Sequence, residues 1–498
     1  MPEMIDVTAE DLTAIRVGLT ALPDLAHHVA GTPVAPDQMF FPYSHGAALD
    51  PDVALVVGNR GVGKSFWASA LAGEASRAAI ADAYRGYRNQ RRLDGLRVGF
   101  GFSGAEGGGN ALISSAHISS VGPKTPAALP WRAAVVRFLA PIVEREIPAK
   151  FNALIAWIKD NPDEQQALFR DADRLLSERG ERALILFDQL EQMANDWSRI
   201  NELTQGLLQI ALAMKSYKSI RLKIFMRPDQ FENPDLFRFP DGSKIRGEAL
   251  RLWWRPTDLY ALLYFELLRN PASSRPLLDI CRRFGMVQEP SNASKLPPDL
   301  VANEDQQRQV FEVIAGELMG KGRNRGAPYT WIPLHLSDAK GEVSPRSFLK
   351  SLKAAADHEP APRNSAIDFK GINDGVRATS DHRLTELQED YPWVSQALEP
   401  LRGALVPALK DEVFERWRSA EVENDILMQY EGIRVPSVLV GRLLFSSGDD
   451  GKEALLKSLQ EIGVLDVRKN GKIDVPDIFR VRAGILRKGG VPPQQRPR

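Results

Sequence analysis

The residues best suited to chemistry in this chain are eight consecutive positions that follow the pattern G-x-x-x-x-G-K-S. They are Gly58, Asn59, Arg60, Gly61, Val62, Gly63, Lys64 and Ser65. Glycines at this spacing let backbone N–H groups surround a phosphate, the lysine brings a charge to the outer phosphates, and the serine hydroxyl can hold Mg²⁺. The pattern predicts a phosphate-binding loop for ATP and Mg²⁺, and we assign Phe66, the next residue, to the same site.

The elements around this loop agree with that chemistry. An apolar run at 53–57 predicts a buried strand before the loop, and a helix is expected at 65–71 after it. A helix that begins at the loop directs the positive end of its dipole toward the bound phosphates. An accidental glycine-rich turn is the alternative, and it would require neither element.

Further along the chain, apolar strands alternate with helices. We expect strands at 96–102, 183–187 and 222–226 and a helix at 201–215. The period at 131–179 is helical, in two pieces divided at Asn161 and Pro162, where the first residue can cap and the second can start a helix. Such alternation predicts an α/β fold, a parallel sheet flanked by helices with its functional side chains at the carboxyl ends of the strands.

Asp188 directly follows the strand expected at 183–187. If that strand lies beside the strand that precedes the loop, the carboxylate is directed at a Mg²⁺ ion held by Ser65, with water between them. An Asp at a strand-to-helix turn can instead be a helix N-cap. The predicted metal ligands are Ser65 and Asp188.

Hydrolysis needs a group that orients or deprotonates a water molecule beside the outermost phosphate. Glu191 is our candidate for the general base. Gln189, directly after Asp188, can position water without accepting its proton. Purely structural roles are the alternative for both residues.

Two arginines are candidate sensors of the outermost phosphate. Arg227 follows the strand expected at 222–226, so its charge would fall near that phosphate, and a surface arginine that closes a strand is the alternative. Ser344 and Pro345 predict a helix start, and Arg346 in its first turn opposes the helix dipole by roughly a few tenths of a kcal/mol unless an anion lies nearby. An interhelical ion pair is the alternative for Arg346.

Three segments together resemble the STAND branch of AAA-type P-loop ATPases, whose members often show D-Q-x-E and R-P signatures: residues 58–65, 188–191 and 226–228. The resemblance covers roughly residues 50–270 and implies an ATP-driven switch followed by a helical lid and often a winged helix. The chain departs from the family in lacking a clear Gly-x-Pro element after the sensor and a recognisable repeat array. The 188 − 64 = 124 residues between Lys64 and Asp188 are also long for the family, so an insertion there could form a partner-specific surface.

The last hundred residues predict a separate module. A helix at 452–462 precedes β-rich pieces at 464–467 and 473–475, and Asn470-Gly471 between them is typical of a hairpin. Helices followed by such a wing make a winged helix. Residues 464–498 hold nine Lys or Arg against three Asp, a net charge of +6, so this module could contact nucleic acid, or instead bind protein or close over the nucleotide.

Two other basic stretches are candidate contacts for nucleic acid. Residues 84–92 mix aromatic and basic side chains, and residues 321–326 form a basic loop interrupted by glycine. An exposed helix end and a solvated connection are the respective alternatives.

Composition sets limits on the whole chain. Its 64 basic side chains balance 64 acidic ones, so no overall charge draws the molecule to nucleic acid or membrane. The start lacks the order of a secretory signal, and no run approaches 18 apolar residues, so we expect a cytoplasmic protein without a membrane partner. The single cysteine, Cys281, can form no internal disulfide and is expected to be a small apolar residue.

At roughly 100 to 200 residues per domain, 498 residues should hold about three domains. We expect an N-terminal segment at 1–50, an ATPase core with a helical insertion at 51–270, a helical lid region at 271–380 and a C-terminal helical and winged-helix domain at 381–498.

These observations predict an ATP-binding and hydrolysing switch that oligomerises and signals to a partner effector, with phage defence as a setting by analogy alone. One alternative is a DNA-binding AAA-type ATPase similar to loaders or transposition regulators. Another is a nucleotide-gated scaffold with little hydrolysis. A small-molecule kinase fits less well, because no acceptor pocket is evident after the sensor strand.

Overall fold

The fold is described from a computed structural model, and the residues that it describes are 7–25, 31–85, 93–104, 111–194, 196–286, 296–320, 325–430, 439, 443 and 449–493. Among these residues the chain divides into two compact units. The P-loop unit lies within His27–Leu252, and the helical unit lies within Met1–Ala26, Trp253–Glu431 and Val438–Arg498. Residues 7–25 therefore group with the helical unit and residues 31–50 with the P-loop unit, while the four-part division at 50, 270 and 380 stays a prediction.

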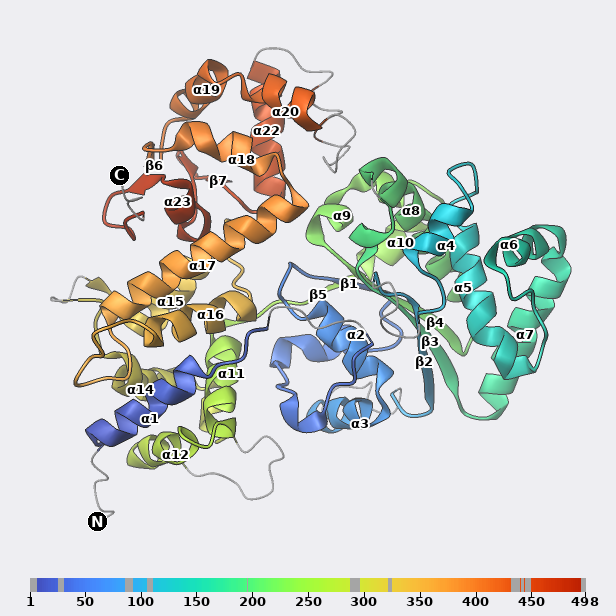
Figure 1. The fold of residues 1–498 in the computed structure, drawn as a ribbon. Coiled ribbons are helices and arrows are strands. Elements are labelled where there is room, and N and C mark those ends of the chain that lie inside the picture. The colour runs from blue at the N-terminus through green and yellow to red at the C-terminus, as the bar shows by residue number, and fades with distance from the viewer. Residues whose placement is uncertain are drawn as a thin grey trace. The chain divides into compact units, whose positions relative to one another are not determined.

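A five-stranded parallel sheet forms the centre of the P-loop unit (Figure 1). Its strands are β1 (Leu55–Val57), β2 (Leu96–Phe102), β3 (Arg182–Phe187), β4 (Ile220–Met226) and β5 (Leu250–Arg251). The strands expected around and after the loop are thereby confirmed. The expectation that β3 lies beside β1 is wrong, because the order is β2-β3-β4-β1-β5 and β4 pairs with both strands.

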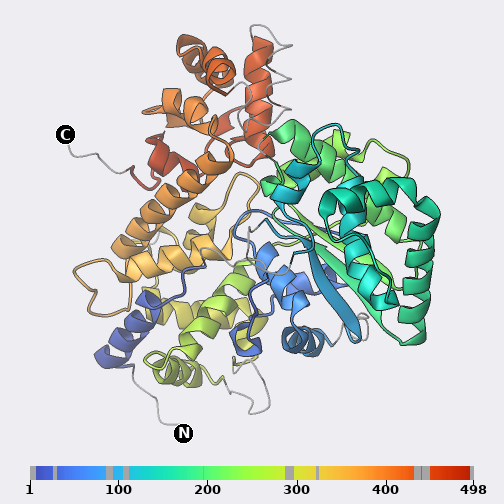
Figure 2. The same cartoon turned by 45° about the vertical axis from the view of Figure 1, so that its right-hand side comes forward.

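The helices of the P-loop unit confirm the predicted α/β alternation (Figure 1 and Figure 2). They are α2 (Lys64–Ala72), α3 (Glu74–Ala83), α4 (Ser115–Ser120), α5 (Leu129–Leu139), α6 (Phe151–Asp160), α7 (Pro162–Glu178), α8 (Trp197–Met214), α9 (Pro228–Glu232) and α10 (Gly242–Gly247).

Alternation of side chains along the strands assigns the two faces of the sheet to different neighbours. Residues such as Ile185 of β3 and Ile224 of β4 share one apolar cluster with α5, α7 and α8. The intervening residues point to the other face, where Lys223 of β4 donates to the carbonyl oxygens of Ala48 and Val53. Helix α2 lies on this second face, since its Trp67 donates to His45, which belongs to the same short helix (Tyr43–Leu49) as Ala48. Alternate residues such as Lys223 point to this second face. Where the same alternation continues past the ends of β3 and β4, it directs the next residues of this set to the side of the sheet that carries α2.

The long stretch between β2 and β3 contains α4, α5, α6 and α7. The division before Pro162 is confirmed, but the expectation of a single helix from 131 to that point is wrong, because α5 and α6 are separate. Pro141 and Pro148 lie between them, and proline lacks the N–H that a continuing helix needs. Asn161 occupies the N-cap position of α7, but its side chain donates to the Trp157 carbonyl and does not cap the helix.

The helical unit is made mostly of α-helices. They are α1 (Ala9–Thr20), α11 (Pro256–Arg269), α12 (Ser274–Arg283), α13 (Asp299–Ala302), α14 (Glu304–Ala315), α15 (Pro328–Leu336), α16 (Pro345–Ala356), α17 (Phe369–Asp390), α18 (Val394–Leu398), α19 (Lys410–Ser419), α20 (Val422–Tyr430), α22 (Asp449–Glu461) and α23 (Asp477–Ala483). A buried aromatic pair joins α11 and α15, because Tyr260 stacks on Tyr329 with ring centroids 4.0 Å apart. Two small sheets complete the unit, β6 (Leu405–Val406) with β9 (Leu486–Arg487) and β7 (Asp466–Val467) with β8 (Ile473–Asp474).

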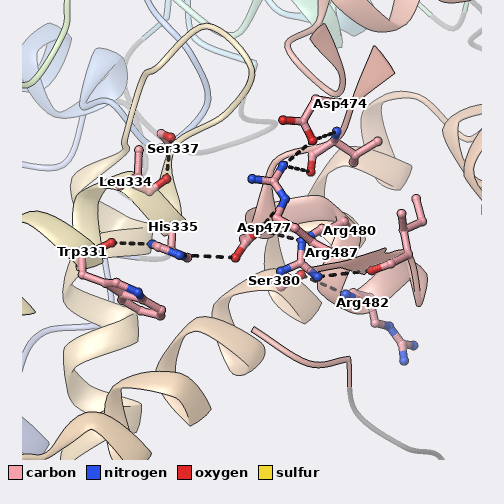
Figure 3. Close-up of polar contacts among 12 residues, drawn as sticks. Trp331, Leu334, His335, Ser337, Ser380, Asp474, Asp477, Arg480, Arg482 and Arg487 are labelled. Carbon is pink, nitrogen blue, oxygen red and sulfur yellow. Dashed lines mark hydrogen bonds and ion pairs between the residues drawn. The ribbon is translucent and has the colours of Figure 1, made fainter. Parts of the chain in front are cut away.

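The C-terminal part confirms the predicted helix and hairpin. Helix α22 precedes β7 and β8, which pair antiparallel around a turn in which Gly471 has a φ of +76°. Four arginines of this basic stretch form ion pairs, and Figure 3 shows those of Arg480 and Arg487. The four pairs are Arg468–Asp474, Arg487–Asp474, Arg480–Asp477 and Arg482–Asp381. Three of the four pairs use Asp474 or Asp477, which the net charge of +6 already counts. A winged-helix identity for this part stays a prediction.

Several predicted segments fall outside the described residues. They are 86–92 of the first basic stretch, 321–324 of the second, 105–110 of the loop after β2, and Arg496 and Arg498 in the basic tail. Among the helices that the structure describes, none has the length and apolar character needed to cross a membrane.

Candidate nucleotide-binding site

The loop at 58–65 connects β1 to α2, as the sequence predicts. Gly61 and Gly63 have φ values of +80° and +109°, in the region that favours glycine, so these two positions permit the tight curl of the loop. The Gly58 N–H donates to the Met226 carbonyl at 3.1 Å and so ties the start of the loop to the end of β4. Phe66 follows on α2, with its ring centroid 5.2 Å from that of Trp67.

Lys64 is the first residue of α2 and carries the positive charge of the loop. Its Nζ donates to the carbonyl oxygens of Gly58 at 2.7 Å and Asn59 at 3.1 Å. Burial lowers the pKa of Lys64, while the carboxylates of Glu191 and Asp188 oppose that effect. The lysine is therefore in electrostatic range of both predicted carboxylates, although they follow a strand two positions away from β1 in the sheet.

Asp188 follows β3 on the side of α2 and is 0% exposed. Burial raises its pKa to about 6, against the opposing effects of the Ser65 hydroxyl and the Lys64 charge. Neither carboxylate oxygen has a hydrogen-bond partner of good geometry within the described part of the chain. A buried carboxylate in this condition is costly unless a cation or donors satisfy it.

The candidate general base lies in a short turn after Asp188. Gln189 has a φ of +56°, and the turn at Leu190–Gln192 is a single stretch of 3-10 helix in which Glu191 is partly exposed. The side chain of Gln189 packs over Gly104, because a Cβ atom at Gly104 would lie 2.6 Å from Gln189 Oε1. A left-handed conformation is unusual for glutamine and is typical of tightly constrained turns.

Arg227 directly follows β4 and is 7% exposed. Its Nε donates to Asp229 at 3.1 Å, and its guanidinium carbon lies 5.9 Å from the centre of the Trp197 ring. The positive charge of Arg227 is felt at Lys64, where it lowers the lysine pKa. The structure thus brings Lys64, Asp188, Glu191 and Arg227 together at the carboxyl edge of the sheet.

Two polar residues of this edge were missed by the sequence interpretation. Asp229 pairs with Arg227, and its carboxylate weakly opposes the lowering of the Lys64 pKa by burial. Ser103 follows β2 next to Asp188, is 1% exposed, and its hydroxyl lacks a partner among the described residues. Ser103 directly follows β2 and Asp229 comes three residues after β4, and these positions just past apolar strands are the sequence signal that could have indicated them.

The residues present fit Mg²⁺ with nucleotide phosphates. The unsatisfied carboxylate of Asp188 and the Ser65 hydroxyl are hard oxygen donors on the same side of the sheet. No cluster of three or more His, Cys, Asp or Glu that could hold a metal occurs within the described ranges. The remaining ligands would thus be phosphate oxygens and water, which Mg²⁺ retains readily.

Arg346, the second predicted sensor, belongs to the helical unit. The predicted helix start is confirmed, because the Ser344 side chain accepts from the Ser347 N–H and Pro345 opens α16. Arg346 donates from Nε to the Leu25 carbonyl at 2.9 Å and forms an ion pair with Glu386 of α17. This is the interhelical ion pair weighed as the alternative, and a sensor role for Arg346 stays a prediction.

Neither the family models nor the curated proteins include a match to this chain. Among solved structures, it is similar to the Aeropyrum pernix ORC2 protein in ADPNP-ADP complexes, with 12% identity and a TM-score of 0.39 over 89% of this chain and 93% of that one. It is also similar to Cdc6p from Pyrobaculum aerophilum, with 14% identity and a TM-score of 0.25 over 86% of this chain and 83% of that one. It is similar as well to the Aeropyrum pernix ORC1 protein in complex with DNA, with 12% identity and a TM-score of 0.33 over 93% of each chain. Values this low do not establish a shared function, and the site rests on its own geometry.

Proposed function

We propose that this protein binds ATP with Mg²⁺ and hydrolyses it, as a P-loop ATPase of the AAA type. The observation that carries the proposal is the convergence of Lys64, Asp188, Glu191 and Arg227 at one edge of the sheet, beside the phosphate-binding loop. Three separate segments supply these charges, and their motifs are the ones that resemble the STAND branch.

Each residue has a distinct task in this proposal. Lys64 exchanges its bonds to the Gly58 and Asn59 carbonyls for phosphate oxygens, with the backbone N–H groups of the loop around them. Ser65 and Asp188 hold Mg²⁺, which neutralises charge on the phosphates when it is bound. Glu191 takes the proton of the attacking water, and Gln189 orients that water. Arg227 contacts the outermost phosphate.

The direct test is nucleotide binding measured by calorimetry with Mg²⁺. Lys64→Ala should lose ATP binding, because the Lys64 ammonium group is the charge proposed to contact the outer phosphates. Lys215→Ala is the matched control, since this lysine of the same unit pairs with Glu248 near the surface. Unchanged ATP affinity in Lys64→Ala would refute the proposal. Glu191→Gln should retain ATP binding and lose phosphate release, and wild-type turnover in that variant would move the base role elsewhere, first to Gln189.

For the biological role we propose a switch that oligomerises with ATP and signals to a partner effector, with phage defence as one setting. Light scattering in Mg-ATP and in Mg-ADP tests it, because a nucleotide-driven switch should change mass between the two. Equal mass in both would argue against oligomerisation as the output.

The second candidate is a DNA-associated AAA-type ATPase, supported by the tip of the β7–β8 hairpin. Lys469 is exposed and Lys472 partly so, on either side of the Asn470-Gly471 turn. Duplex DNA should then stimulate hydrolysis, and binding should weaken with salt in proportion to the number of contacting cations. Replacing Lys469 and Lys472 with Ala should reduce the salt slope by about two. An ATPase rate that DNA leaves unchanged would favour the signalling switch.

A further inference from the structure

The guanidinium of Arg227 is held from two sides. Its Nε donates to Asp229 Oδ1 at 3.1 Å, and the pair is sheltered, with side chains 9% and 17% exposed. Trp197, at the start of α8, presents its ring 5.9 Å from the guanidinium carbon. A carboxylate at one edge and an aromatic ring nearby restrict the orientations that the guanidinium can adopt.

The local backbone fixes Asp229 in turn. Pro228 is the first residue of α9 and Asp229 the second, so the carboxylate lies in the first turn, where the helix dipole favours negative charge. The Phe231 N–H donates to the Arg227 carbonyl at 3.0 Å, and the Arg227 N–H donates to Gln230 Oε1 at 3.4 Å. The ion pair is therefore built into one closed turn at the end of β4.

Asp229 belongs to the charged group around the loop. Its carboxylate lies within electrostatic range of Lys64, as do those of Glu191 and Asp188. Among these three acids, it is the one with an ion pair to the candidate phosphate sensor.

We propose that Asp229 is a positioning residue for Arg227 and thereby sets how strongly the site distinguishes a nucleoside triphosphate from the diphosphate. This inference rests on the proposed function. By accepting from Nε, Asp229 orients the terminal nitrogens of the guanidinium, which are the donors suited to a two-pronged phosphate contact. The loop contacts phosphates that both nucleotides share, so the difference in affinity depends on groups that reach the outermost phosphate.

The experiment measures Kd for Mg-ATP and Mg-ADP by calorimetry and compares their ratio. Asp229→Ala should reduce the preference for ATP by about tenfold, the usual effect of losing one charge-assisted hydrogen bond, and change ADP affinity by less than about twofold. Asp229→Asn keeps an oxygen that can accept from Nε, so it should recover most of the preference. Asp235→Ala is the matched control, since Asp235 pairs with Arg238 at 2.8 Å in the next turn, on the exposed surface.

A double-mutant comparison separates positioning from general damage to the fold. In an Arg227→Ala background, Asp229→Ala should change the ATP/ADP ratio no further, because the arginine through which it acts is gone. Melting curves of all variants identify any that fail to fold, and Asp229→Leu, which also lacks an acceptor for Nε, then replaces Asp229→Ala in the comparison.

The outcomes distinguish the two proposals. If the wild-type protein prefers ATP and Asp229→Ala preserves that ratio, or if the effect persists without Arg227, the positioning role is overturned while the proposed function stands. If the wild-type protein binds neither nucleotide, the proposed function fails and this inference fails with it.

Discussion

Replacing Asp188 with Asn should make the nucleotide-free protein more stable at neutral pH while it removes activity. The carboxylate is 0% exposed, and burial raises its pKa from 3.8 to about 6. At about 1.36 kcal/mol for each pH unit, that difference corresponds to about 3 kcal/mol of cost for the ionised form. The buried amide of Asn has donors that also lack partners, at about 1–3 kcal/mol, so the net gain at pH 8 is on the order of 1 kcal/mol.

The stability gain of Asp188→Asn should depend strongly on pH. A carboxyl group with a raised pKa costs the folded state its full amount above the folded value and nothing below the unfolded value. At pH 4.5 the cost is about 1 kcal/mol, whereas at pH 8 it is about 3 kcal/mol. The amide does not titrate, so the advantage of Asp188→Asn should shrink by about 2 kcal/mol between pH 8 and pH 4.5.

Calorimetric melting of both proteins at the two pH values, without nucleotide or metal, measures the effect. Groups that titrate equally in both proteins cancel in the difference. A difference in stability between variant and wild type that stays the same at pH 8 and pH 4.5 would refute the reasoning about burial. Addition of Mg-ATP should raise the melting temperature of the wild type and leave that of Asp188→Asn nearly unchanged, because the variant lacks the carboxylate that we propose as a metal ligand.

Three further predictions follow from packing and burial. A Cβ atom at Gly206 would lie 2.5–2.7 Å from backbone atoms of Ala127 and Ala128, so Gly206→Ala should lower stability by about 1–3 kcal/mol in melting experiments, while Gly247→Ala, with open space around it, should not. Burial lowers the pKa of His335, although the carboxylate of Asp477 beside it (Figure 3) has the opposite effect. The unfolded chain therefore binds more protons at this residue than the folded chain, so acidification through pH 6.5 should destabilise the protein. His335→Gln should reduce this dependence of stability on pH. Burial raises the pKa of Cys281 to about 12, so a thiol reagent should label it only after denaturation, and rapid labelling of the native protein would contradict its burial.

The sequence was sufficient for those parts of the fold that depend on local pattern. Apolar runs located the strands, and glycine and lysine spacing located the loop, because these features are fixed by backbone requirements that one segment meets alone. The order of the strands was not accessible in this way. An apolar strand such as β3 carries no mark of its neighbour, and the position of β4 between β1 and β3 is visible only in the folded sheet.

Charge counted along the chain did not show which basic side chains are accessible in the folded protein. Arg480 contributes to the basic tail in sequence, yet it is 0% exposed and pairs with Asp477. Whether a charge is available to a ligand depends on its burial and on the acid that it pairs with, and a net count shows neither.

The same principle applies in the opposite direction at the nucleotide site. Asp229 looks like an ordinary helix-start acid in sequence, and its significance comes only from the folded turn that pairs it with Arg227 beside Lys64. An arginine fixed by a neighbouring acid loses less rotamer freedom when it contacts phosphate, because its rotamers are already restricted in the folded protein before nucleotide binds. A sensor built this way should lose little conformational entropy when it binds the outermost phosphate. The ratio of the affinities for ATP and ADP would show that smaller loss as a stronger preference for ATP.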